Sequence, residues 1–452
     1  MHIVIVGNGK VGHTLSGMLS SEGHDVVIID SDPESFRSIE ADHDVQYIEG
    51  SGANYSVLES AGVAKSDLVI AVTNADELNI LTCLIARKLG AESTIARIRD
   101  PELASQLHHI KQELGLTMSI NPEFEAANEI TRILHNPSVL KIDSFAAGKV
   151  EMVELKISET SPIAGKRIQD FRIFGLQHFV ICAVEREGEV YIPNGSFVIQ
   201  KNDKIFVSVE TTNLSTLLNG FGMPKRQIKD VVIVGGGRIS YYLARRLLQN
   251  NMTVRIIEKS EERCKFLKSE LEKAIVIHGD GSSEILLQNE DIRGADAFVA
   301  LTNIDEENLV MSLYALYKGA SKVITKVNRL NYLEAFAHTD IDTVISPKML
   351  TSEQIVKYVR AMSNTAGSAV RALYKLSGDR VEALEFEVDS QTKHRKLPLS
   401  KVPFKNGVLL ACISRRNKVI IPRGDDFIQV GDVVVLVTKD HFVSSLNEIF
   451  ES

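Results

Sequence analysis

The chain opens with a short apolar run that meets a glycine-rich turn. Ile3 to Val6 are four β-forming residues, and Gly7-Asn8-Gly9-Lys10-Val11-Gly12 follow directly. Apolar residues then recur at helical spacing. A second apolar run, Val26 to Ile29, ends at Asp30. Strand, glycine turn, helix, strand and acid within about 30 residues predict a βαβ unit of the dinucleotide-binding type.

Each position of this turn has a physical role in such a unit. Gly7 permits the tight turn, Gly9 lets the backbone approach a pyrophosphate, and Gly12 lets the helix lie close to the strand. The first N–H groups of the helix then attract the phosphates. Asp30 can accept hydrogen bonds from both ribose hydroxyls and repels a 2′-phosphate, which favours NAD(H) or an adenine nucleotide over NADP. The alternative is a glycine turn that only packs.

Two further strands end in polar residues. Leu68 to Val72 reads as a doubly buried parallel strand, and Thr73 and Asn74 follow it. Thr94 to Ile98 is the next strand, with Arg97 near its end. Ligands bind at the carboxyl ends of strands in open α/β sheets. We therefore expect Arg97 to contact a nucleotide, and a structural salt bridge is the alternative, because burying an unpartnered cation is costly.

Acidic and proline-containing pairs mark the starts of several helices. Asn121-Pro122 and Ser346-Pro347 combine an N-cap with proline at the first helical position. Asp76-Glu77 and Asp305-Glu306 begin two other helical patterns. Metal ligation is one interpretation of these acids, but capping and first-turn acids explain them at least as well. We expect Asp76 to cap its helix, and we expect no metal site.

The chain then repeats itself. Val231 to Glu258 reproduces the opening at an offset of 228, and later matches run at an offset of 229. They extend past the glycine turn, since Thr73 to Asn79 matches Thr302 to Asn308 and Arg97 matches Lys326. A repeat of this length indicates duplication of a two-domain unit rather than a solenoid of short modules.

The second copy departs from the first at several positions. Its turn reads Gly235-Gly236-Gly237-Arg238-Ile239-Ser240, so a serine replaces the third glycine. We expect Ser240 to push the helix slightly off the strand. Glu258 is one methylene longer than Asp30, and Lys326 is a single mobile charge where arginine offers a fork. The second copy is therefore expected to bind less tightly or with different selectivity. Lys10 and Arg238 either steer phosphates or are solvated loop residues.

Each βαβ region is followed by a small β-rich module. From Val150 the apolar period changes from 3.6 to 2, and short apolar runs follow between turns. The second half repeats this pattern from Leu384. We expect an α/β protein with two Rossmann-like doubly wound parallel sheets, each followed by a small α+β domain. The expected domains are 1–140, 141–224, 225–365 and 366–452.

Composition narrows the class of protein. The 452 residues are 44% hydrophobic and 24% charged with a net charge of −8, as in an ordinary soluble protein rather than a nucleic-acid binder. No apolar run is long enough to cross a bilayer, and we expect neither a signal peptide nor disulfides. The histidines of the β modules, His178 and His394, are isolated rather than parts of a catalytic cluster. An NAD-dependent oxidoreductase nevertheless remains the alternative function.

The motifs and their order together resemble those of the RCK (KTN) family. GNGKVG, the acid at Asp30, IEGSG, AVTNADELN and IARIRDPE occur in sequence, a β module follows, and the whole unit is doubled. The resemblance covers essentially the whole chain as two RCK-N and two RCK-C domains. It implies a protein without chemistry of its own, which forms a homo-oligomeric, tetrameric ring on the cytoplasmic face of a potassium-uptake channel. NAD(H), ATP or ADP would change the shape of the ring.

The resemblance also implies which residues bind the nucleotide. In the first unit they are Gly7, Asn8, Gly9, Lys10, Val11, Gly12, Asp30, Ser51, Thr73, Asn74 and Arg97. In the second unit they are Gly235, Gly236, Gly237, Arg238, Ile239, Glu258, Asp280, Thr302, Asn303 and Lys326. No catalytic residue is expected.

Overall fold

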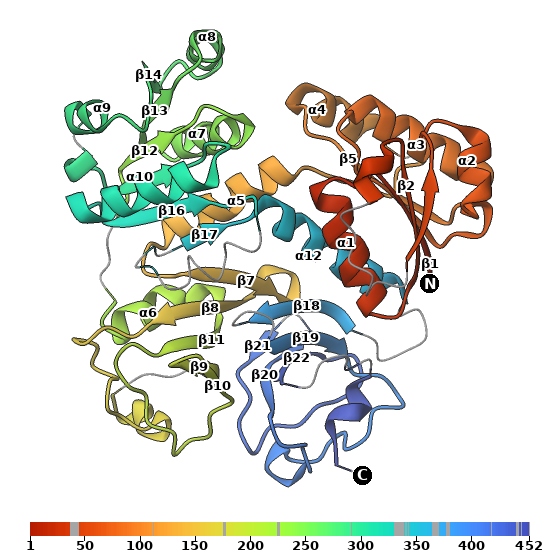
Figure 1. Ribbon diagram of the computed structural model, residues 1–452. Coiled ribbons are helices and arrows are strands. Elements are labelled where there is room, and N and C mark those ends of the chain that lie inside the picture. Colours follow the sequence, from red (N-terminus) through yellow and green to blue (C-terminus); the bar gives the residue numbers. More distant parts are fainter. Residues whose placement is uncertain are drawn as a thin grey trace. The chain divides into compact units, whose positions relative to one another are not determined.

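The computed structural model divides the chain into two compact units (Figure 1). Unit 1 consists of Met1–Thr131 and Lys229–Val356, and unit 2 of Arg132–Ile228 and Lys357–Ser452. Both halves of the repeat thus contribute to both units. The structure describes residues 1–36, 45–111, 113–174, 178–223, 227–290, 292–329, 339, 341, 343–363, 370–376, 380–416, 418–439, 443 and 445–451.

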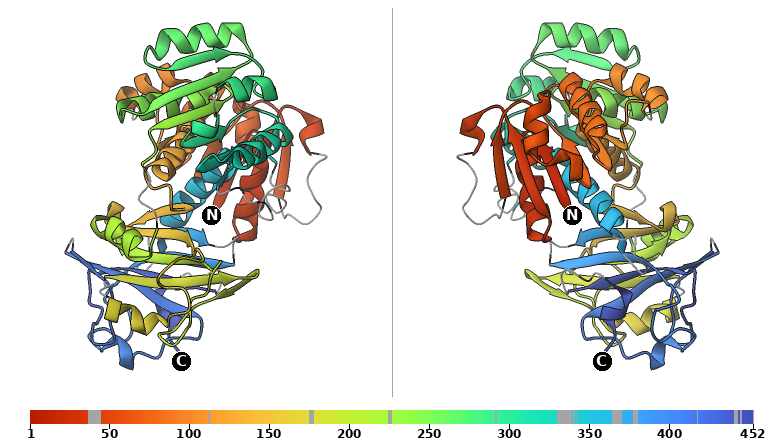
Figure 2. Two further views of the ribbon diagram at one scale, coloured as in Figure 1. Left: turned by 90° about the vertical axis from the view of Figure 1, so that its left-hand side faces the viewer. Right: turned by 90° about the vertical axis from the view of Figure 1, so that its right-hand side faces the viewer.

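The first half of unit 1 is a six-stranded parallel sheet in the order β3-β2-β1-β4-β5-β6. This is the strand order of a Rossmann fold, and helices flank the sheet (Figure 2). The strands are β1 (His2–Val6), β2 (Asp25–Asp30), β3 (Val45–Glu49), β4 (Leu68–Ala71), β5 (Ser93–Arg97) and β6 (Met118–Ile120). The helices are α1 (Lys10–Ser21), α2 (Tyr55–Ser60), α3 (Asp76–Leu89), α4 (Pro101–Ile110) and α5 (Pro122–His135).

The second half of unit 1 repeats this sheet in the order β14-β13-β12-β15-β16-β17. The strands are β12 (Asp230–Val234), β13 (Thr253–Glu258), β14 (Ile275–His278), β15 (Ala297–Ala300), β16 (Lys322–Lys326) and β17 (Thr343–Ile345). The helices are α7 (Arg238–Gln249), α8 (Glu261–Glu270), α9 (Glu284–Asn289), α10 (Asp305–Lys318) and α12 (Pro347–Ser363). The predicted pair of doubly wound parallel sheets is confirmed.

Burial and register explain why the polar residues gather at one edge. Ile3 to Val6 are at most 1% exposed, as expected for a strand covered on both faces. In the same register Val6 pairs with Ile29 on one side and with Ala71 on the other. The residues that follow these strands therefore emerge together at the carboxyl edge of the sheet.

Unit 2 contains two five-stranded antiparallel sheets, one from each half of the chain. Their orders, β10-β9-β11-β8-β7 and β21-β20-β22-β19-β18, are equivalent. The outer strands β7 and β18 were missed by the sequence analysis, because polar or charged residues interrupt their short apolar runs. The first sheet contains β7 (Lys141–Phe145), β8 (Val150–Lys156), β9 (Phe179–Arg186), β10 (Glu189–Tyr191) and β11 (Lys204–Glu210), with α6 (Leu214–Gly220) after it. The second contains β18 (Val370–Leu376), β19 (Val381–Glu387), β20 (Val408–Arg415), β21 (Lys418–Ile420) and β22 (Val433–Thr438). The domain limits at 140, 224 and 365 stay predictions.

The two β modules share a hydrophobic core besides having cores of their own. Phe145 and Phe206 of the first module and Val381 and Val435 of the second belong to a single buried cluster. The backbone N–H of Ala146 also donates a 2.8 Å hydrogen bond to the Glu385 carboxylate. Unit 2 is therefore one folded body rather than two independent modules.

The same buried ion pair stabilises both modules. Arg186 donates hydrogen bonds of 2.7 and 2.8 Å to the two carboxylate oxygens of Asp203, which is fully buried. Arg415 binds Asp432 in the same way at 2.9 and 2.8 Å. Such a bidentate pair fixes a β hairpin against the turn that precedes the next strand.

We predict that Arg186→Met destabilises the chain by about 3–5 kcal/mol, because it leaves the Asp203 carboxylate buried without its cation. Urea denaturation, compared with the wild type, measures the loss. Lys201→Met is the control: its partner Glu159 lies 3.0 Å away and both side chains are largely exposed, so the change should stay within about 1 kcal/mol. Equal effects of the two variants would contradict the prediction.

Candidate functional site

Both glycine turns have the backbone that the sequence predicts. Gly7 and Gly235 have φ of +103° and +97°, which strongly favours glycine. Helices α1 and α7 begin directly after Gly9 and Gly237. A Cβ on Gly12 would lie 1.9 Å from the carbonyl oxygen of Gly7, so the third glycine permits the close approach of helix and strand. The N-termini of both helices are thus held at the carboxyl edges of their sheets.

The acid after the second strand holds each turn in place. Asp30 accepts hydrogen bonds of 2.6 Å from the N–H of Asn8 and 2.9 Å from the N–H of Asp32. Glu258 accepts equivalent bonds of 2.5 and 2.7 Å from the N–H groups of Gly236 and Ser260. Each carboxylate oxygen has further lone pairs, so both acids can still accept hydrogen bonds from ribose hydroxyls.

The helix displacement that we expected from Ser240 stays a prediction, although the backbone of the cap residue is nearly the same in both copies. The cap residues Gly9 and Gly237 have nearly the same dihedral angles, with φ of −69° and −68° and ψ of −170° and −171°. Ser240 is fully buried, and its hydroxyl donates a hydrogen bond to the carbonyl of Gly235. The serine is accommodated because its polar atom finds a partner in the turn itself.

A buried asparagine ties the next two strand ends together in each copy. The Asn79 side chain accepts bonds from the Thr73 N–H at 2.8 Å and the Thr73 hydroxyl at 2.7 Å, and it donates to the Arg97 carbonyl at 2.9 Å. Asn308 makes the same contacts with Thr302 and Lys326. Both amides are fully buried. They fix the two polar strand ends that the sequence assigned to the ligand.

The acids at the starts of α3 and α10 lie in the first turns, as predicted, but Asp76 is not the N-cap. Ala75 occupies that position. Asp76 instead accepts hydrogen bonds of 2.7 and 2.8 Å from the N–H groups of Arg99 and Asp100, and Asp305 accepts equivalent bonds from the matching loop. Each carboxylate therefore fixes the loop after the strand that ends in Arg97 or Lys326.

Arg97 makes no salt bridge among the described residues. Its guanidinium donates hydrogen bonds of 2.8 Å to the Thr73 carbonyl and 3.2 Å to the Asn74 side chain. Arg97 is 8% exposed, and its buried Nε has no hydrogen-bond partner. Burial, together with the charge of Arg99, lowers the pKa of Arg97. The charges of Glu123 and Asp76 oppose this shift only in part, so a phosphate would add counter-charge at the guanidinium.

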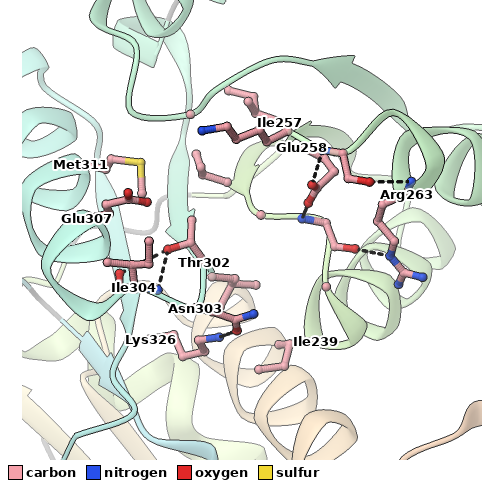
Figure 3. A pocket seen from close by; sticks show the side chains of 18 of the residues that line it. Ile239, Ile257, Glu258, Arg263, Thr302, Asn303, Ile304, Glu307, Met311 and Lys326 are labelled. Carbon is pink, nitrogen blue, oxygen red and sulfur yellow. Dashed lines mark hydrogen bonds between the residues drawn. The ribbon is translucent and has the colours of Figure 1, made fainter.

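Lys326 occupies the equivalent place in the second copy. Its ammonium donates a 3.1 Å hydrogen bond to the Asn303 side chain (Figure 3). Burial, and to a smaller extent the charge of Lys10, lowers the pKa of Lys326 to about 8, although Asp305 and Glu123 oppose that shift. An anion beside this lysine would restore its usual pKa.

The predicted residues of the second copy surround one cavity of about 710 Å³ (Figure 3). The side chain of Glu123, at the start of α5 in the first half, also lines it. The predicted residues in its lining are Gly235, Gly236, Gly237, Arg238, Ile239, Glu258, Asp280, Thr302, Asn303 and Lys326. This volume is in the usual range for a small-molecule site.

The predicted residues of the first copy meet in the same way at the edge of their sheet. The turn from Gly7 to Gly12 contacts Asp30 through Asn8, while Thr73, Asn74 and Arg97 are hydrogen-bonded to one another. Ser51 follows β3, whose Glu49 pairs with Asp30. In the second copy Asp280 takes the place of Ser51 and binds Lys259 at 2.7 Å. Lys259 has no counterpart cation in the first copy, where Ser31 follows the acid.

Three kinds of site residue were missed from the sequence. Asn79 and Asn308 lie at matching positions of the repeated motif, and the presence of asparagine in both copies could have identified them as site residues. Glu123 is contributed by the other half of the chain, which no local pattern reveals. Arg263 lies on α8 and lines the cavity, but the first copy has Ser35 at the matching position.

Two searches of the described residues bear on the class of protein. No helix in this part of the chain is both long and apolar enough to cross a membrane. No group of three or more histidine, cysteine, aspartate or glutamate side chains within it is arranged to hold a metal ion.

Family models match most of the chain. The TrkA-N domain model matches residues 3–122 and 231–347, and the TrkA-C domain model matches residues 152–222. The Trk system potassium uptake protein TrkA homolog 1 of Methanosarcina mazei is 34% identical over the full length of both chains. The TrkA protein of Halomonas elongata is 30% identical over 97% of this chain and 96% of its own.

Solved structures share the fold. The RCK domain of GsuK has a TM-score of 0.62 at 18% identity and covers 96% of this chain and 92% of its own. The GsuK channel bound to NAD has a TM-score of 0.63 at 18% identity and covers 97% of this chain and 76% of that one. At such identities the similarity establishes the architecture alone.

We predict that Asn79→Ala lowers the free energy of unfolding by about 1–3 kcal/mol, because the Thr73 N–H and the Arg97 carbonyl lose their buried partner. Asn308→Ala should cost a similar amount in the second copy. Denaturation midpoints measure both losses. Asn250→Ala, at an exposed helix end, is the control and should stay within about 0.5 kcal/mol. A loss as small as that of the control would show that the buried amides are dispensable.

We predict that Lys326→Met stabilises the chain near neutral pH. The pKa of Lys326 is about 8 in the folded chain against 10.5 for an ordinary lysine, so the unfolded chain binds more protons between these values. The cost of burying the charge is then fully present below pH 8 and disappears as the pH approaches 10.5. The gain over wild type should reach about 2–3 kcal/mol at pH 7 and shrink steadily above pH 8 in urea denaturation. A gain that is independent of pH would contradict this assignment.

Proposed function

This chain belongs to the TrkA family of potassium-uptake proteins, and we propose on that basis that it is the regulatory subunit of a potassium-uptake channel or transporter. In this proposal the Rossmann units bind nucleotides, and the resulting change of shape is transmitted to a Trk-type membrane subunit. The relatives named above are potassium-uptake proteins by name, and the match to two of them spans nearly their whole length.

The observation that supports nucleotide binding best is the buried cation at the carboxyl edge of each sheet. Arg97 and Lys326 are 8% and 6% exposed, and burial lowers the pKa of both. Holding a cation there without an anionic partner costs free energy. A phosphate at the adjacent helix N-terminus removes that cost in both copies.

The acids indicate which nucleotides fit. Asp30 and Glu258 stand where ribose hydroxyls bind and would repel a 2′-phosphate. We therefore propose NAD(H), with ATP or ADP as further ligands, and we propose as contacts all the residues assigned to the two units above. The titles of two GsuK structures name NAD and ADP as bound ligands of that protein.

The proposed role is regulation without catalysis. In the described part of the chain, the cavity lined by Glu258 and Lys326 contains no histidine or cysteine. A dehydrogenase needs a second domain that positions a substrate, whereas each Rossmann unit here is followed by a β module. The oxidoreductase alternative predicts turnover of NADH with an acceptor.

A direct contact between the halves offers a route for the ligand signal. The Tyr242 hydroxyl on α7 donates a 3.3 Å hydrogen bond to the Arg99 carbonyl and accepts one of 3.0 Å from Asn121. The ring of Tyr242 packs edge-on against that of Phe124, with 5.4 Å between the ring centroids. The guanidinium carbon of Arg246 lies 5.1 Å from the centroid of the Phe124 ring. A nucleotide that moves α7 would therefore also move the loop after β5. A ligand shifts such an equilibrium only by its differential affinity for the two shapes.

The partner and the assembly follow from the family. We propose a homo-oligomer, as a tetrameric ring, bound peripherally to the membrane subunit on the cytoplasmic face of the inner membrane. Peripheral binding requires only protein contacts, which agrees with the absence of a spanning helix from the described residues.

We predict that the full-length chain co-sediments with vesicles containing a Trk-type membrane subunit, and that nucleotide changes the bound fraction. Asp30→Ala combined with Glu258→Ala should abolish this nucleotide response, because each acid contributes charged hydrogen bonds worth about 1.5–3 kcal/mol. Calorimetry of each single variant with NADH and ATP measures the loss at one site. Asp25→Ala is the control, since Asp25 lies at the opposite end of β2.

Two results would contradict the proposed function. One is association with the vesicles that no nucleotide alters, in a chain that also fails to bind nucleotide by calorimetry. The other is steady turnover of NADH by the purified chain with a simple acceptor, which would favour the oxidoreductase.

A further inference from the structure

The two crevices differ in charge at the fifth position after the acid. Glu258 is followed at this distance by Arg263 on α8, whereas Asp30 is followed by Ser35. The Ser35 carbonyl accepts a 2.7 Å hydrogen bond from the Asn8 side chain. In the second copy the hydrogen bond runs in the opposite direction, since the Arg263 side chain donates to a carbonyl of the glycine turn. Besides Lys259, Arg263 is thus a second cation of this cavity that the first copy lacks at the matching position.

Arg263 is held in a defined orientation beside the cavity (Figure 3). Its Nε donates a 2.6 Å hydrogen bond to the carbonyl of Gly236, the second residue of the glycine turn. The carbon at the centre of its guanidinium lies 4.4 Å from the centroid of the Phe266 ring. A guanidinium fixed at Nε and layered on an aromatic ring keeps its plane, and such planes stack on other flat π systems.

No carboxylate forms a salt bridge with this guanidinium among the described residues, although the charge of Glu258 partly opposes the lowering of its pKa by burial. The two oxygens of the nearby Glu258 accept hydrogen bonds from backbone N–H groups, and Arg263 forms no salt bridge in that part of the chain. Arg238, which lines the same cavity, contributes a second positive charge. Burial and the charge of Arg238 lower the pKa of Arg263. The cation is thus available to an electron-rich group of a ligand.

We propose that Arg263 determines the specificity of the second crevice by stacking its guanidinium plane on the purine base of an adenine nucleotide. The inference rests on the proposed nucleotide-binding function and adds the part of the ligand that this residue recognises. Every base can stack on a flat side chain, but a larger π face stacks more strongly, so stacking favours purines over pyrimidines. It also disfavours a positively charged ring such as oxidised nicotinamide.

The geometry favours the base over a phosphate as the partner of Arg263. Phosphates bind at the N-terminus of α7, where Arg238 and the last residues of the turn lie. Arg263 instead lies on the side of Glu258, whose position corresponds to the ribose. A second phosphate there would meet the Glu258 carboxylate. The group that extends beyond the ribose on this side is the base.

The experiment uses the full chain with Asp30→Ala, so that the second crevice accounts for the remaining binding. ATP, CTP and inorganic tripolyphosphate are titrated by calorimetry into this parent, and the Asp30→Ala, Glu258→Ala chain gives the background. Arg263→Ser, which introduces the residue found at position 35, should lower the affinity for ATP at least about fivefold. The affinity for CTP should fall less, and the affinity for tripolyphosphate should stay unchanged. Arg263→Lys keeps the positive charge but removes the planar guanidinium, and it should also lose the preference for purines. Arg245→Ser, at an exposed position of α7, is the control and should leave all three affinities unchanged.

Three results would overturn the inference. Unchanged ATP affinity in Arg263→Ser would remove the residue from the site. Equal weakening of ATP and tripolyphosphate would make it a phosphate contact instead. A purine preference retained by Arg263→Lys would show that charge alone suffices. If instead the wild-type chain bound none of the nucleotides, the proposed function itself would fail, and the inference with it.

Discussion

The site depends on one type of hydrogen bond, from the backbone of the glycine turn to the acid after the second strand. Asp30 and Glu258 each accept the N–H of the residue that follows the first glycine. This bond joins the end of the first strand to the end of the second and fixes where helix α1 or α7 begins. Because the protein holds the carboxylate before any ligand binds, the proposed ribose site and the proposed phosphate site would be preorganised together. The buried asparagines then align the remaining strand ends with them.

Local patterns in the sequence were sufficient for most of the fold. Glycines, apolar runs and helix starts predicted both parallel sheets, because each of these patterns lies within or next to the strand or helix that it predicts. The outer strands β7 and β18 were missed because polar or charged residues interrupt their short apolar runs. Asp76 was assigned as a cap because sequence distance favoured its own helix, while its actual partners lie more than 20 residues away.

The site was predictable where it is local and unpredictable where it is shared. The turn, the acid and the strand ends were all found, since their spacing follows from the βαβ connection. Glu123 was not found, because it reaches the second cavity from the other half of the chain. The hydrogen bond that the Ser240 hydroxyl forms inside the turn was also not foreseen, because added volume was the only effect considered. Packing outcomes of this kind depend on ångström-scale geometry that residue identity alone does not specify.

The core shared by the two β modules has a consequence for how the two proposed nucleotide sites can evolve. In a symmetric dimer of identical chains every substitution appears twice, so the two sites must change together. Here Phe206 of the first module and Val435 of the second lie in one core, and both modules belong to one chain. The two modules are therefore always present in equal numbers. A mutation therefore alters one site at a time while the pseudo-symmetric scaffold persists. The difference between Arg263 and Ser35 is an asymmetry that a symmetric dimer of identical chains could not inherit.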